Sequence, residues 1–161
     1  MTSATKSGRG SGRRCASAGA GTPSSGANAR GRPAELPALV SVDDSGERVG
    51  IATYTVDGDT AELVTIDALT PGAGVGRRLL DAAATAARAA GAVWLRVMTT
   101  NDNLPALRLY QRTGFRLVEL RPGAVDQARS RKPSIPKTGH EGIPIRDELD
   151  LVLDLGDSPA P

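Results

Sequence analysis

Hydrophobic and polar positions alternate in short segments after Pro37 and predict a series of strands. The segments 38–42 and 48–56 are rich in Val, Ile, Thr and Tyr and flank the polar turn DDSGE, a pattern typical of a β-hairpin. A second turn at 57–59 leads into a similar segment at 61–69. The pattern therefore predicts three consecutive strands in an antiparallel meander.

The periodicity changes after the third predicted strand. Leucine and alanine recur on one face of a helix over 76–90, and Gly91 is the expected stop. The next segment, VWLRVMTT at 93–100, is almost continuously apolar. Such a run predicts a strand that is buried on both faces.

The rest of the chain continues to alternate between helix and strand. The stretch NDNLPALRLYQRTGF predicts a helix, because polar caps precede Pro105 in the first turn and Gly114 ends it. Strands are predicted at 115–120 and 147–155, a short helix near 123–131, and a Pro- and Gly-rich loop over 132–146. We therefore predict an α/β (α+β) domain with a mixed sheet, and the sequence contains no internal repeat.

The first 36 residues differ in composition from the rest. Ser, Gly, Ala and Thr dominate, and no large apolar run occurs before Leu36, so the segment buries too little surface to offset its ordering entropy. We expect residues 1–36 and 157–161 to be disordered, which leaves one domain at 37–156. The tail has a net charge of +5 and the whole chain +2. The positive charge of the chain comes from the tail, so it does not support nucleic-acid binding by the domain.

Other features limit the compartment and the cofactors. No segment approaches the roughly 18 apolar residues of a membrane span. The single cysteine, Cys15, lies in the tail and can form no internal disulfide, which favours a reducing cytoplasm. The single histidine, His140, has no second histidine or cysteine in the domain beside it. We therefore expect a cytoplasmic protein without a membrane segment and without a metal site.

Alternating glycines at 72, 74 and 76 lie directly before the first predicted helix. A loop without side chains at a helix start exposes backbone N–H groups and binds anions. A nucleotide P-loop needs Lys and Ser or Thr after the last glycine, but Arg77 and Arg78 follow here. The G-x-G-x-x-G spacing of dinucleotide-binding folds is not met either. The remaining known glycine loop is the pyrophosphate loop of acetyl-CoA enzymes.

Two separated stretches carry a resemblance to a known family. The first is LVTIDALTPGAGVGRRLLDAA, and the second is NDNLPALRLYQRTGF, in which the spacing N-x-x-A-x-x-L-Y-x-x-x-G-F is met in full at 103–115. With these motifs the chain resembles the GNAT superfamily of acetyl-CoA-dependent N-acetyltransferases over about 38–155. Its last segment, KPSIPKTGHEGIPIRDELDL, is similar to that of a bacterial subgroup. The resemblance implies a mixed, mostly antiparallel sheet flanked by helices, with acetyl-CoA as co-substrate and no metal.

The resemblance also implies how acetyl-CoA is held. The backbone around 66–69 would pair with the pantetheine arm like an added strand, and the amides of 72–77 would hold the pyrophosphate, with Arg77 or Arg78 adding positive charge. Asn103 would bond the pantetheine or phosphate region. The implied cofactor-binding residues are Ile66, Asp67, Ala68, Leu69, Gly72, Ala73, Gly74, Val75, Gly76, Arg77, Asn103 and Ala106.

Two residues are the implied catalytic groups. Tyr110 would protonate the leaving thiolate as general acid, and Glu62 would deprotonate the incoming amine directly or through water. The acceptor would be a primary amine, on a small molecule or a peptide, that attacks the thioester directly in a ternary complex. From the residues alone, a tyrosine on an amphipathic helix is usually a core aromatic, and a carboxylate at a strand end is commonly just solvated. A basic run at 129–132 can meet the ribose phosphate of coenzyme A or be a solvated face.

Two departures from the family pattern leave alternatives open. Pro71 stands where the family's loop usually opens with Arg or Gln. The tail stands where the family has a strand and one or two helices that wall the acceptor pocket, so these elements are expected to be missing. The pocket is then open, or is covered by another chain, as in a homodimer, or the assigned start of the coding sequence is wrong. A noncatalytic acyl-CoA-binding module is the alternative function, and nucleic-acid binding through the tail is a third hypothesis.

Overall fold

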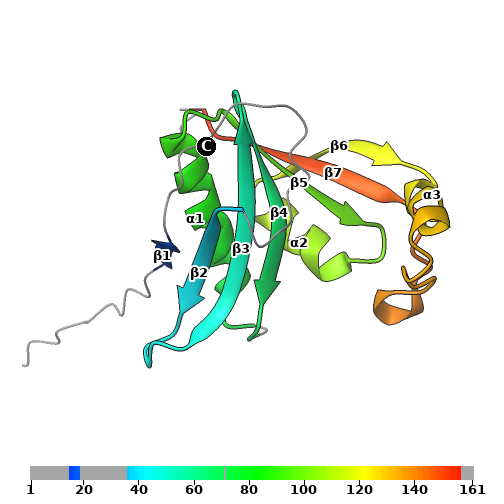
Figure 1. Cartoon of the computed structure of the whole chain (residues 1–161), viewed down its shortest axis with the longest axis horizontal. Helices are drawn as coiled ribbons and strands as arrows, with labels where there is room; N and C mark the ends of the chain where they lie inside the picture. The colour runs from blue at the N-terminus through cyan, green and yellow to red at the C-terminus, as the bar shows by residue number, and fades with distance from the viewer. Residues whose placement is uncertain (1–14, 19–35, 71, 157–161) are drawn as a thin grey trace, which may run out of the picture.

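One mixed sheet organises the computed structural model, which describes residues 15–18, 36–70 and 72–156 (Figure 1). Within these residues the sheet has seven strands in the order β1-β2-β3-β4-β5-β7-β6, and its one parallel pair is β4 with β5. The strands are β1 (Cys15–Ala18), β2 (Ala38–Val42), β3 (Arg48–Asp57), β4 (Thr60–Ala68), β5 (Trp94–Thr100), β6 (Arg116–Arg121) and β7 (Glu148–Asp154). The helices are α1 (Val75–Ala89), α2 (Leu104–Arg112), α3 (Ala124–Arg131) and the short η2 (His140–Gly142).

The element order agrees with the pattern of the sequence. β2, β3 and β4 form the expected antiparallel meander, and α1 follows the glycine loop. This confirms the predicted mixed, mostly antiparallel sheet flanked by helices. None of the described helices is long and apolar enough to cross a membrane.

β1 lies within the segment that we expected to be disordered. Its four residues pair with β2, from Cys15 opposite Ser41 to Ala18 opposite Ala38. Strand pairing uses backbone N–H and C=O groups, so small residues can extend an open sheet edge without burying large side chains. The structure differs from the expected disorder at residues 15–18, while the rest of 1–35 and residues 157–161 lie outside the described residues.

The core lies between the sheet and α1. The apolar stripe of α1, which includes Leu79, Leu80 and Ala83, is buried mainly against β2, β3 and β4. Contact with β3 is close at Gly50, where an added Cβ would lie 2.5 Å from Val75 Cγ1. A larger residue at position 50 would therefore push α1 away from the sheet.

α2 packs on the same face of the sheet as α1 (Figure 1). Tyr110 of α2 and the adjoining Phe115 belong to the same buried cluster as the α1 stripe. The first turn of α1 touches α2, because a Cβ added at Gly76 would lie 2.9 Å from Leu109 Cδ2. The glycine loop and α2 are thus neighbours in space.

The other face of β5 is exposed, which contradicts the expected burial on both faces. Leu95 and Val97 are buried toward the helices, whereas Trp94 is 41% and Met98 46% exposed. The prediction was wrong because α1 and α2 both cover one face, so an apolar run alone does not ensure burial on the second. We call this second side of the sheet, which neither α1 nor α2 of the described part of the chain covers, the helix-free face.

The Pro- and Gly-rich loop after α3 is held by polar side chains from neighbouring segments. Arg129 donates to the carbonyl oxygens of Ile135, Pro136 and Ile145 at 2.8 to 3.1 Å. Asn101 Oδ1 accepts the N–H groups of residues 146 and 147. Arg129, the first residue of the basic run, therefore fixes the loop backbone, while Arg131 and Lys132 are exposed.

Candidate active site

β4 and β5 diverge halfway along their length (Figure 1). They pair only from Thr60 opposite Trp94 to Leu63 opposite Val97. Beyond this point β4 continues with β3 as far as Ala68, and β5 continues with β7 as far as Thr100. Among the described residues, the two strands therefore have no partner on their facing edges at this end, and we call the space between them the β4–β5 gap.

The backbone groups of β4 that face the β4–β5 gap can be assigned from its pairing with β3. The N–H of Leu69 donates to the carbonyl of Val49 at 2.9 Å, and the register is regular over residues 65–68. Backbone groups alternate in direction along a strand, so Ile66 and Ala68 turn their N–H and C=O groups toward the gap. An extended ligand could pair with this edge as an added strand does.

The glycine loop ends in a helix start without a cap. Gly72 and Gly74 have φ of 78° and 70°, a left-handed conformation that side chains disfavour. The first bond of α1 runs from the N–H of Arg78 to the carbonyl of Gly74 at 3.1 Å, and no side chain caps the helix. The N–H groups of the first three helical residues therefore have no acceptor within the helix and can donate hydrogen bonds to an anion.

The two arginines after the loop have different environments. Arg78 folds back, and its Nη1 donates to the carbonyl of Ala73 at 2.8 Å. The Arg77 side chain is 64% exposed and pairs with Asp81, one turn further along, at 3.7 Å. Arg77 therefore supplies exposed positive charge at the helix entrance, whereas Arg78 holds the loop.

Tyr110 directly follows Leu109, the residue of α2 that lies next to Gly76 at the start of α1. It is buried inside the core. Its side chain is 3% exposed, and its ring packs on Phe115 with centroids 5.6 Å apart. Burial raises the pKa of Tyr110 to about 12. Among the described residues, none accepts a hydrogen bond from its hydroxyl. The phenol therefore keeps its proton at neutral pH, and its O–H group is available to donate a hydrogen bond to a ligand.

Asn103 is the N-cap of α2. Its Oδ1 accepts the N–H of Ala106 at 3.3 Å, and Pro105 occupies the first turn. The side chain thus begins the helix that carries Tyr110. Asn103 itself is exposed, and Ala106 is half-buried against the core.

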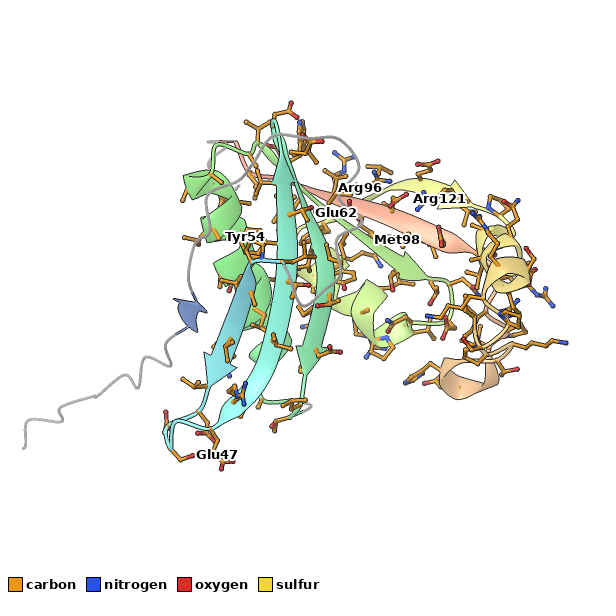
Figure 2. All side chains as sticks on the ribbon, in the orientation of Figure 1. Glu47, Tyr54, Glu62, Arg96, Met98 and Arg121 are labelled. Carbon is orange, nitrogen blue, oxygen red and sulfur yellow. The ribbon has the colours of Figure 1, made fainter. Side chains whose placement is uncertain are left out.

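Glu62 is exposed on the helix-free face, immediately before β4 and β5 diverge. It lies directly opposite Arg96 in the parallel pairing of the two strands (Figure 2). The pKa of Arg96 is raised, first by its hydrogen bond to Asp150 and further by the charges of Asp150, Glu62 and Glu119. The carboxylate of Glu62 therefore lies close enough to interact with a fixed cation.

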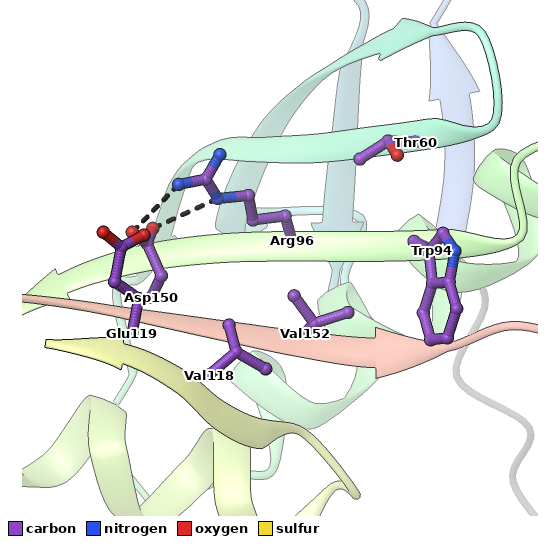
Figure 3. Close-up of a pocket in the computed structure, with 7 residues that line it drawn as sticks. All are labelled: Thr60, Trp94, Arg96, Val118, Glu119, Asp150 and Val152. Carbon is purple, nitrogen blue, oxygen red and sulfur yellow. Dashed lines mark hydrogen bonds and ion pairs between the residues drawn. The ribbon is translucent and has the colours of Figure 1, made fainter.

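A buried ion-pair cluster beside Glu62 was missed by the sequence reasoning. Asp150 is 1% exposed, and its carboxylate binds Arg96 Nε at 3.2 Å and Arg96 Nη2 at 2.9 Å (Figure 3). It also binds Arg121 Nη2 at 2.9 Å. Arg121 also pairs with Glu148 at 3.2 Å. The sequence pattern predicted a strand at 147–155 and did not single out Asp150. An arginine inside the apolar run of β5 was the available signal for a buried partner.

Replacing Asp150 by asparagine is expected to lower the free energy of unfolding by about 2 kcal/mol, since two arginines lose their negatively charged partner but can still reach water. Urea unfolding measures this change. The matched control is Asp81→Asn, whose ion pair with Arg77 is exposed and is worth about 0.5 kcal/mol or less. Equal losses in the two variants would mean that the buried cluster does not stabilise the sheet.

The only histidine of the sequence, His140, is not part of a group of potential metal ligands among the described residues. The His140 side chain is exposed and pairs with Glu141 at 3.7 Å, and its backbone N–H donates to Asp102. Within the described ranges, no group of three or more His, Cys, Asp and Glu residues is arranged to hold a metal ion.

Comparisons with known proteins agree with one another. Residues 17–115 match the model of the acetyltransferase (GNAT) family. Two uncharacterized proteins of Bacillus subtilis (strain 168) are similar in sequence: YdhI is 38% identical over 115 residues, covering 71% of this chain and 72% of YdhI. YxbD is 40% identical over 121 residues, covering 75% of this chain and 76% of YxbD.

Solved structures share the fold at lower identity. A GNAT family acetyltransferase from Elizabethkingia anophelis with acetyl-CoA bound has a TM-score of 0.67 and 20% identity, over 88% of this chain and 97% of its own. A Bacillus subtilis acetyltransferase in complex with CoA has a TM-score of 0.64 and 23% identity, over 75% and 78% of the two chains.

Proposed function

Because this chain belongs to the GNAT acetyltransferase family, we propose that it transfers the acetyl group of acetyl-CoA to a primary amine. The observation that carries the proposal is the β4–β5 gap, which opens next to an uncapped glycine loop. The first offers backbone partners to an extended chain, and the second offers donors to an anion. Coenzyme A contains both an extended pantetheine arm and a pyrophosphate anion.

Acetyl-CoA would bind with its pantetheine arm in the β4–β5 gap. Ile66 and Ala68 supply backbone donors and acceptors there, and the amides of 72–77 receive the pyrophosphate, with Arg77 at the helix entrance. Asn103 begins the helix on the other side. Two proteins of the same fold were solved with coenzyme A or acetyl-CoA, which supports this assignment of the ligand.

The reaction would be a direct attack in a ternary complex. The amine nitrogen forms a bond to the thioester carbon, Glu62 takes the proton that the nitrogen loses, and the carbon–sulfur bond breaks as Tyr110 donates a proton to the leaving thiolate. The N–H of Ala68 is suited to polarise the thioester carbonyl. The only cysteine of the sequence lies at position 15, before the meander, so no cysteine of the domain is assigned a covalent intermediate.

Replacing Gly72 by alanine is expected to weaken coenzyme A binding about tenfold, because a side chain at positive φ costs about 1 to 2 kcal/mol and displaces the loop amides. Isothermal titration calorimetry with coenzyme A measures the affinity. Gly46→Ala is the matched control, since Gly46 has φ of 86° in the β2–β3 turn and an added Cβ meets nothing within 4 Å at either glycine.

The two variants separate backbone strain from ligand binding. Both should lose similar stability, and only Gly72→Ala should lose affinity. If coenzyme A binds both variants as tightly as it binds the unaltered chain, the glycine loop is not the pyrophosphate site. If it does not bind the unaltered chain, the proposed function fails.

A noncatalytic acyl-CoA-binding module is the second candidate, and the burial of Tyr110 is the observation that favours it. A module of this kind would need the β4–β5 gap and the loop but no exposed acid. Release of coenzyme A from acetyl-CoA in the presence of an amine distinguishes the two candidates, because a binding module would not turn over.

A further inference from the structure

An open hollow of about 490 Å³ lies on the helix-free face, over β5, β7 and β6 (Figure 3). Trp94 stands at one end and Arg96 at the other, with Val118 and Val152 along the floor between them. Arg96 directly precedes Val97, the last residue of β5 that pairs with β4. The Arg96 end of the hollow therefore adjoins the point at which the two strands diverge.

The Arg96 end has an excess of negative charge. Arg96 and Arg121 are balanced by Asp150 and Glu148, with which they form ion pairs. Glu62 and Glu119 also act on Arg96 through their charges. Both are exposed, and neither forms an ion pair with another described residue. Two carboxylates are thus left without a paired cation where the hollow meets the divergence.

The Trp94 end combines an aromatic surface with a carboxylate. The indole is 41% exposed, and Asp154 lies opposite Trp94 in the antiparallel pairing of β5 and β7, so both side chains project from the helix-free face. Asp154 is exposed, and its Oδ1 accepts the backbone N–H of Gly156 and, among the residues that the structure describes, no other hydrogen bond. An exposed aromatic ring beside a carboxylate attracts an organic cation.

We propose that this hollow is the acceptor subsite and selects an amine that carries a second positively charged group on an apolar linker. The inference rests on the proposed acetyltransferase function. The reacting amine lies beside Glu62 and Glu119, the linker crosses the valines, and the second cation lies on Trp94 beside Asp154. Arg96 lies two positions after Trp94 along the strand, a rise of roughly 7 Å, which an aminobutyl chain spans.

Three probes that share an aminobutyl chain test the selection. Putrescine ends in a second ammonium group, n-pentylamine in a methyl group and δ-aminovalerate in a carboxylate. Trp94 is the only tryptophan of the sequence, so its fluorescence in the full chain reports occupation of the hollow without any turnover. Putrescine should give a saturable change with a Kd about tenfold lower than that of n-pentylamine, and δ-aminovalerate should bind most weakly.

A pair of aspartate variants tests the second cation directly. Asp154→Asn should raise the Kd of putrescine about threefold and leave that of n-pentylamine unchanged, because only the far ammonium group meets this carboxylate. Asp44→Asn, in the exposed β2–β3 turn, is the matched control and should change neither value. A loss of putrescine affinity in both variants would indicate a general effect of net charge and would contradict the assignment.

The outcomes separate this inference from the proposed function. Equal binding of putrescine and n-pentylamine, or tighter binding of δ-aminovalerate, would overturn the selection for a second cation. Tighter δ-aminovalerate binding would instead indicate that Arg96 receives an anion. Coenzyme A release with all three amines at one rate would keep the proposed function and reject this inference. Saturable putrescine binding without coenzyme A release would keep the subsite and reject the transfer.

Discussion

Replacing Tyr110 by phenylalanine is expected to lower kcat roughly a hundredfold or more, the usual contribution of a general acid. The thiolate of coenzyme A needs a proton only as the carbon–sulfur bond breaks. The KM for acetyl-CoA should therefore change little, because the lost interaction is absent from the ground state. Initial rates of coenzyme A thiol release at varied acetyl-CoA concentrations, with a saturating concentration of the best amine of the panel above, measure both constants.

The buried position of Tyr110 also predicts a pH effect on stability. Its pKa is raised from 10.0 to about 12, so above pH 10 the unfolded chain releases a proton that the folded chain keeps. Stability is therefore fully present below pH 10 and falls as the pH rises toward 12. Tyr110→Phe should lose less stability over this window than the unaltered chain, which urea unfolding at several pH values measures.

Tyr54→Phe is the matched control for the kinetic prediction. Tyr54 is the other tyrosine of the sequence and lies half-buried on β3 (Figure 2). β4 separates β3 from β5 in the sheet. Its variant should keep its activity within about twofold, as is usual for a substitution away from the chemistry. If both variants turn over equally well, the phenol of Tyr110 is a core group and not the acid.

Replacing Glu62 by glutamine is expected to lower kcat/KM for the amine about a hundredfold at neutral pH. An amine is mostly protonated there and must lose a proton before or during attack. The deficit should shrink as the pH rises, since more of the amine is then already neutral. Initial rates as a function of pH, with one amine at concentrations well below its KM, give the profile.

Glu47→Gln is the matched control for Glu62→Gln. Glu47 is exposed in the β2–β3 hairpin, at the end of the molecule away from Arg96 (Figure 2). This variant should retain the full rate at every pH. A deficit in Glu62→Gln that stays constant as the pH rises would assign Glu62 to charge attraction of the amine rather than to proton removal.

The strands and helices were predictable where a local signal was strong. The alternation in 38–69 indicated the meander, and the glycines before 76–90 indicated a loop that opens a helix. The burial of β5 was not predictable, because the exposure of Trp94 and Met98 depends on which face α1 and α2 cover. Periodicity within a strand contains no information about distant helices.

The candidate site was predictable only in part, and for a similar reason. Motif spacing located the glycine loop and Tyr110 in the sequence, but it could not reveal that Tyr110 is buried or that Arg78 folds onto Ala73. The burial of Asp150 was not predictable, because its arginine partners come from β5 and β6. Cross-strand ion pairs depend on the sheet order, which no single segment encodes.

A crystal structure of the chain with coenzyme A would show whether the β4–β5 gap and the glycine loop bind the coenzyme. We expect the pantetheine arm between β4 and β5 and the pyrophosphate about 3 Å from the amides of 72–77. The coenzyme sulfur should lie within roughly 3.5 Å of the Tyr110 hydroxyl oxygen. Coenzyme A bound elsewhere with the β4–β5 gap empty, or a sulfur out of reach of Tyr110, would contradict the proposed function of this site.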